Sequence, residues 1–206
     1  MRTDTVDDFL SQLAARVPAP GGGATAALHA AQAAALVAMV GRYSDSARYA
    51  DHAAEIATIT ATADRLRQDA LGLAEDDAAA FTSVTQAYGL PKETAEEAAT
   101  RSAAIAKALL GAARVPAMVV TVAEQILRLA ERLRPIGNRN VISDVAAAAE
   151  AARAAATTAR VNVEVNLAGV KDPAAWGELA AVAGNVDDLV LRAEKITAAV
   201  RDGLVR

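Results

Sequence analysis

Residues 59–84, ITATADRLRQDALGLAEDDAAAFTSV, place an apolar side chain or Asp77 at every third or fourth position. This spacing puts side chains on one face of a helix, and it predicts a long amphipathic helix over residues 51–88. The apolar members of this stripe are Ile59, Ala63, Leu66, Ala70, Leu73, Phe81 and Val84. Asp77 falls near the centre of the stripe, so the longest predicted helix carries one carboxylate toward the interior.

The neighbouring acids point elsewhere on the same helix. At 100° per residue, Asp69 and Asp76 fall about 80 to 100° from the stripe, and Glu75 falls about 160° away. Burying a lone carboxylate costs several kcal/mol unless it is paired or neutralised. Two interpretations of Asp77 remain open: a structural tie to an arginine or a helix terminus, or a functional acid.

Composition favours one all-α domain over residues 1–206, a bundle of long antiparallel helices. More than half of the residues are apolar, alanine is abundant, and aromatic residues are few. Alanine is the strongest helix former, and its small side chain lets helices approach closely. The net charge of −4 and the scattered arginines argue against nucleic acid as a partner. We see no signal peptide and no uninterrupted apolar run of membrane-spanning length, so we expect a cytoplasmic protein without a membrane partner.

The sequence Pro18-Ala-Pro-Gly-Gly-Gly23 is expected to be a non-helical turn that leads into an apolar helix over residues 24–43. Gly21, Gly22 and Gly23 leave bare N–H groups at the start of that helix, where an anion can bind. The alternative is a tight turn that permits close helix packing. Because the helix is apolar nearly all round, we expect a second subunit to cover part of it in a homodimer. His29 has no second ligand nearby, so we expect no metal site.

The second half of the chain is predicted to be helical as well. Thr94 and Glu97 form a capping box that starts a helix ending near residue 113, and Pro116 is expected to begin another. A long helix is expected from residue 143 or 144. On it, Asp144, Asn162 and Asn166 lie within about 40° of one another, because eighteen residues make five turns. Residues 161–167 alternate in polarity like a strand, but helix remains the preferred interpretation because no partner strand is evident.

Several short motifs resemble one known family. Pro18–Gly23, Asp77 with Ala80-Phe81, and Leu90-Pro91-Lys92 are similar, in that order, to elements of the formiminotetrahydrofolate cyclodeaminase and methenyltetrahydrofolate cyclohydrolase family. The later elements that match are Gly137-Asn138 with Ser143-Asp144, Asn162-Val163 with Asn166-Leu167, and Lys171-Asp172.

The resemblance implies an all-helical dimer that acts on the one-carbon bridge between N5 and N10 of tetrahydrofolate. Members either expel ammonia from a 5-formimino group or hydrate the 5,10-methenyl bridge to 10-formyltetrahydrofolate. The acidic catalytic residue of the family maps onto Asp77, and no permanently bound cofactor is expected. The alternative is a non-catalytic helical dimer that binds folate or serves as a structural subunit.

The remaining candidate residues are expected to bind substrate. Gly21–Gly23 and Lys92 are candidates for holding the glutamate tail. Asn138, Asn162 and Asn166 are candidates for contacting the pterin edge, with Asp144 as a second choice, because amides offer both donors and acceptors.

Overall fold

The computed structural model describes residues 2–204, which form seven α-helices and two short 3-10 helices. The predicted all-α fold is confirmed, and residues 2–204 contain no strand. In chain order the elements are α1 (Val6–Ala14), α2 (Gly22–Arg42), η1 (Ala47–His52), α3 (Ala53–Tyr88), α4 (Ala95–Ile136), η2 (Arg139–Val141), α5 (Ser143–Leu167), α6 (Pro173–Gly184) and α7 (Val186–Leu204).

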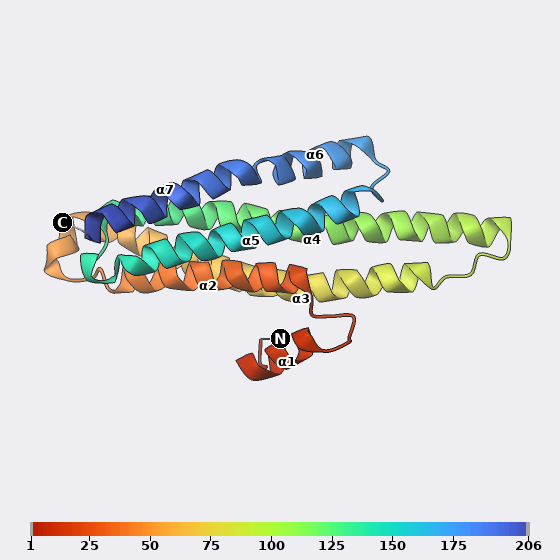
Figure 1. Ribbon diagram of the computed structural model, residues 1–206, viewed down its shortest axis with the longest axis horizontal. Helices are drawn as coiled ribbons and strands as arrows, with labels where there is room; N and C mark the ends of the chain where they lie inside the picture. Colours follow the sequence, from red (N-terminus) through yellow and green to blue (C-terminus); the bar gives the residue numbers. More distant parts are fainter. Residues whose placement is uncertain (1, 205–206) are drawn as a thin grey trace.

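Helices α2 to α5 form an elongated bundle, with α6 and α7 along one side and α1 outside it (Figure 1). The faces of α2 and α5 that meet are lined mainly by alanine, including Ala27, Ala34, Ala148 and Ala155, all with no exposed surface. Since no long side chain separates the helices, their backbones approach closely and stability comes from many small contacts.

Most of α2 is buried by its own chain, against α3, α4 and α5. The burial that suggested a second subunit is therefore provided within one chain, and the homodimer stays a prediction. By length and composition alone, α2 and α4 also pass the test for a helix that crosses a membrane, as core helices of soluble proteins do.

The predicted break near Pro116 is wrong, because this proline lies inside α4, a single helix of 42 residues. Proline has no N–H, so the carbonyl of Ala112, four residues earlier, lacks its usual helical donor. The side-chain amide of Asn166 on α5 donates to this oxygen over 3.5 Å. A neighbouring helix therefore compensates in part for the hydrogen bond that Pro116 removes.

The predicted burial of Phe81 and Val84 is also wrong. The side chain of Phe81 is 48% exposed, and Val84 is only partly buried. The reason is visible in Figure 1: the end of α3 and the start of α4 form a helical hairpin that projects beyond the N-terminus of α2. The apolar stripe of α3 is therefore buried up to Leu73 and Ala74 and then loses its cover on one side.

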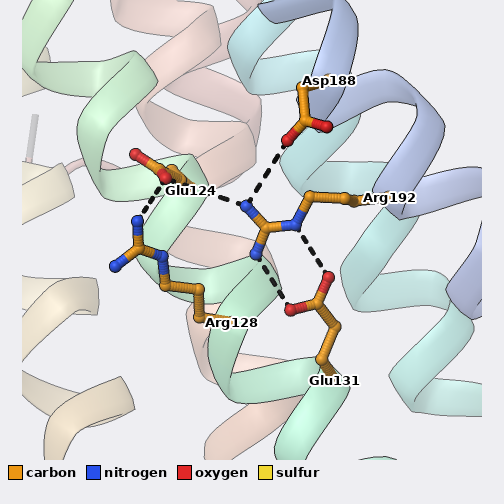
Figure 2. A network of polar contacts seen from close by, with 5 residues as sticks. All are labelled: Glu124, Arg128, Glu131, Asp188 and Arg192. Carbon is orange, nitrogen blue, oxygen red and sulfur yellow. Dashed lines mark hydrogen bonds and ion pairs between the residues drawn. The ribbon is translucent and has the colours of Figure 1, made fainter. Parts of the chain in front are cut away.

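An arginine on α7 fastens this helix to α4 (Figure 2). Arg192 donates two hydrogen bonds to the carboxylate of Glu131, over 2.8 and 2.9 Å. It also forms ion pairs with Glu124 at 3.8 Å and with Asp188 at 4.0 Å. The hydrogen bonds with Glu131 raise the pKa of Arg192, whose side chain is only 17% exposed. Paired geometry of this kind contributes more than an isolated surface pair.

We expect Arg192→Ala to lower the free energy of unfolding by about 1–3 kcal/mol, because Glu131 on α4 loses its partner and Glu124 keeps only Arg128. Arg128, which pairs with Glu124 but is 63% exposed, provides the matched control. Arg128→Ala should cost no more than about 0.5 kcal/mol. Urea unfolding followed by circular dichroism measures both, and equal losses would contradict a special role for Arg192.

Candidate active site

The N-terminus of α2 is built from the glycine stretch. Gly21 is its N-cap and, having no side chain, makes no cap hydrogen bond of its own. Gly22 and Gly23 already belong to the first turn, so the prediction that residues 18–23 are entirely non-helical is wrong at its end. Glycine can adopt helical backbone angles, and its low helix propensity costs least in the first turn of a helix.

Asp77 on α3 points at this helix start. Its Oδ2 accepts a hydrogen bond from the backbone N–H of Ala24 over 3.0 Å. A helix N-terminus favours negative charge, because its first N–H groups lack carbonyl partners. The anion at this helix start is therefore a carboxylate of the same chain, bound by the N–H of Ala24 directly after the glycines. This contact fits both the anion interpretation and the close-packing interpretation of the glycines.

Gly23 makes the contact possible. A Cβ at this position would overlap the carboxyl group of Asp77. A Cβ at Gly22 would instead meet the amide nitrogen of Asn162 at 3.7 Å, an ordinary contact, and at Gly21 it would meet nothing within 4 Å. The three glycines thus have separate surroundings, and only Gly23 is required by the approach of the acid.

Two opposing effects set the acidity of Asp77. Partial burial raises its pKa above the ordinary 3.8, and the hydrogen bond from Ala24 lowers it by less. Within residues 2–204 no lysine or arginine forms an ion pair with Asp77. The neighbouring acids Glu75 and Asp76 are exposed, as predicted from the helix geometry. A carboxyl group with a raised pKa and no cationic partner is suited to exchanging protons.

Asn162 and Asn166 lie near the C-terminus of α5, at the bundle end where α2 begins. The amide of Asn162 donates to the carbonyl of Thr158 over 2.9 Å and lies beside Gly22. The amide of Asn166 donates to the carbonyl of Asn162 over 2.8 Å as well as to Ala112. The structure therefore brings the glycines, Asp77 and Asn162 together, and Asn166 follows one turn further along α5. The side-chain amide nitrogens of both asparagines are bonded to backbone carbonyls.

Asn138 and Asp144 lie at the other end of the bundle. The side-chain amide of Asn138 donates to the carbonyl of Tyr43 over 2.6 Å, and its backbone N–H donates to Ser44 Oγ over 2.8 Å. These partners follow the C-terminus of α2, about 30 Å from its glycines. Asp144 precedes Asn162 by eighteen residues on α5, so about 27 Å separates them along the axis. Within one chain, the structure does not bring Asn138 or Asp144 to Asp77.

Lys92 is exposed in the turn at the tip of the α3–α4 hairpin. Between this tip and Asp77, the two helices enclose a groove of about 530 Å³ that begins at Ala80, one turn beyond the acid. Ser83, Gln86 and Lys107 contribute polar groups to its lining. The sequence analysis missed this groove and Lys107, because the groove exists only where α3 and α4 project together.

Residues 2–204 contain no group of three or more histidine, aspartate or glutamate side chains placed to hold a metal ion. The chemistry available at this site is that of one carboxyl group, backbone N–H groups and side-chain amides.

Comparisons with known proteins agree on one family. A family model described as formiminotransferase-cyclodeaminase matches residues 5–184. The chain is 40% identical over 172 residues to methenyltetrahydrofolate cyclohydrolase of Methylorubrum extorquens, which covers 83% of each protein. It is 33% identical over 171 residues to formimidoyltransferase-cyclodeaminase of the mouse, of which it spans only 30%. The crystal structure of formiminotetrahydrofolate cyclodeaminase from Thermotoga maritima superposes with a TM-score of 0.87 at 27% identity, covering 100% of this chain and 99% of that one.

Fold, site and relatives together define the class: an all-helical enzyme of the cyclohydrolase and cyclodeaminase type. The chain belongs to the formiminotransferase-cyclodeaminase family. The family resemblance expected from the sequence motifs is confirmed.

We expect Gly23→Ala to destabilise the protein by about 1–3 kcal/mol, because the added methyl group displaces the Asp77 carboxylate and breaks its hydrogen bond with Ala24. Gly22→Ala is the matched control, since its methyl group makes only an ordinary contact. It should be neutral or stabilise the helix by up to about 1 kcal/mol. Urea unfolding compares the two variants, and equal effects would show that the Asp77 contact is not the constraint.

The raised pKa of Asp77 also predicts a pH dependence of stability. Between the unfolded value of 3.8 and the higher folded value, the native state binds more protons than the unfolded state. The stability contributed by this group therefore falls as pH rises through that window. Asp77→Asn keeps a neutral acceptor for Ala24, so the stability of the variant relative to wild type should increase from about pH 4 upward and then level off. A difference that is flat or falls with pH in urea titrations would contradict the raised pKa.

Proposed function

We propose that this enzyme acts on the N5–carbon–N10 bridge of a tetrahydrofolate derivative and that hydrolysis of the 5,10-methenyl bridge is its main reaction. The observation that carries the proposal is the partly buried Asp77 at the start of α2, with a raised pKa and no cationic partner. The preference for hydrolysis rests on the cyclohydrolase relative, which is 40% identical and matches the chain over 83% of both lengths.

In hydrolysis, water adds to a carbon that carries the positive charge of the bridge. The Asp77 carboxylate accepts a proton from this water as the carbon–oxygen bond forms. The N5–carbon bond then breaks, the carboxyl proton passes to N5, and the hydroxyl proton leaves to solvent as the formyl group forms. The carboxylate also stabilises the cationic substrate, since no lysine or arginine of residues 2–204 neutralises it.

Cyclodeamination is the second candidate, because the cyclodeaminase from Thermotoga maritima has the same fold over the whole chain. In this reaction N10 attacks the formimino carbon, and the N10 proton passes to the imine nitrogen, which becomes an amino group. The bond between the carbon and this amino group then breaks. Asp77 in its acid form supplies the proton with which ammonia leaves, and a raised pKa increases the population of that form.

The surroundings of Asp77 suggest how the substrate is held. The amides of Asn162 and Asn166 are suited to the polar edge of the pterin. The exposed ring of Phe81, one turn after Asp77, offers a surface for stacking. The groove along α3 and α4 suits the remainder of the substrate, with Lys107 in place for a carboxylate of the tail. We also propose a cytoplasmic homodimer.

We expect Asp77→Asn to lower turnover by about 10² to 10⁴-fold while the helical circular dichroism spectrum is retained. Asp76→Asn is the matched control, since Asp76 is the adjacent acid and is exposed. Loss of the methenyl chromophore follows hydrolysis, and its appearance from the 5-formimino substrate follows cyclodeamination. Unchanged turnover in Asp77→Asn would remove this residue from the mechanism. If the folded wild-type protein were silent in both assays, a non-catalytic helical protein would be favoured.

A further inference from the structure

A second concave site lies at the bundle end opposite to Asp77. It is a cavity of about 370 Å³ where η1, the C-terminal ends of α4 and α7, and η2 meet. Three arginines and a histidine line it: Arg48, Arg134, Arg139 and His52. Among residues 2–204 no acidic residue lines it, although the chain carries a net charge of −4.

These arginines differ from most others in the chain in having no acidic partner. Nine arginines of residues 2–204 form ion pairs with aspartate or glutamate; they are Arg2, Arg42, Arg65, Arg67, Arg128, Arg132, Arg153, Arg160 and Arg192. In the same part of the chain, none of the three cavity arginines does so, and Arg48 contacts only the Tyr49 ring, at 5.9 Å. Of the seven arginines in residues 2–204 that form no ion pair, three therefore line this one cavity.

The backbone around the cavity is held in place by hydrogen bonds. Asn138, just before η2, is bonded to the carbonyl of Tyr43 and to Ser44, which is buried. It also accepts from the N–H of Asn140 over 3.0 Å. These contacts fix the segment that carries Arg139, so Asn138 has a positioning role here. Asp202, the nearby acid on α7, lines an adjoining hollow together with Arg139 and forms no ion pair among the described residues.

We propose that this cavity binds a multiply charged anion, either a phosphate group or a chain of carboxylates. Guanidinium groups bind both through paired N–H donors, and several around one concave surface favour more than one negative charge. Along α2, about 30 Å separates this end of the bundle from the glycines beside Asp77. The anion site is therefore distinct, within one chain, from the site of the catalytic acid.

Arg134 also lies in the last turn of α4, where a cation stabilises the helix dipole without any ligand. Only ligand binding separates the two roles. The experiment titrates the full chain with inorganic phosphate and, separately, with a short γ-linked oligoglutamate peptide, by calorimetry at constant ionic strength. We expect saturable binding of at least one of them. Tighter binding of the peptide identifies a polycarboxylate ligand, and tighter binding of phosphate identifies a phosphate ligand.

The variant Arg134→Ala/Arg139→Ala should weaken this binding by about tenfold or more. Arg114→Ala is the matched control, because Arg114 is exposed on the same helix and about 30 Å away; it should bind like wild type. If the double variant does not fold, Arg48→Ala on η1 provides the second test, with an expected loss of severalfold. Absence of saturable binding to wild type, or equal affinity in wild type and these variants, would overturn the proposal. Because this experiment measures binding alone, its outcome does not depend on whether the protein shows turnover.

Discussion

The hydrogen bond between the N–H of Ala24 and the carboxylate of Asp77 is the constraint on which the site depends. It sets the start of α2 against a fixed position on α3, and it is possible only because residue 23 has no side chain. The same contact holds an acid in partly buried surroundings without a cation to neutralise it. This contact therefore fixes the carboxylate at the start of α2, while partial burial is the larger effect and raises the pKa of the candidate catalytic group.

Much of the fold could be predicted from local sequence rules. The apolar stripe on α3 and the inward direction of Asp77 follow from helix periodicity alone. The capping box formed by Thr94 and Glu97 is present as expected, and Asp172 caps α6. Such rules hold because they depend on neighbours within a few residues.

The wrong predictions concern properties that depend on distant segments. Pro116 does not end α4, because Asn166 on another helix supplies a donor to the carbonyl that the proline leaves without one. Phe81 is exposed, because its cover depends on where α2 begins. Asp144 and Asn162 share one face of α5, but an angle around a helix says nothing about distance along it. The surroundings of Asp77 could therefore be predicted from the sequence, but the groove beside Lys107 could not. The substrate-binding roles of Asn138 and Asp144, which lie far from Asp77 within one chain, stay predictions.

The projecting α3–α4 hairpin joins the full bundle where α2 begins (Figure 1), and Asp77 is hydrogen-bonded to this helix start. At this step the cross-section of the molecule falls from a packed bundle to two helices, and two helices resist bending less than a bundle does. The hairpin is therefore expected to bend most easily at its base, beside Asp77. Bending of the hairpin would change the width of the groove between Ala80 and Lys107, while the hydrogen bond with Ala24 would keep the carboxylate at the start of α2.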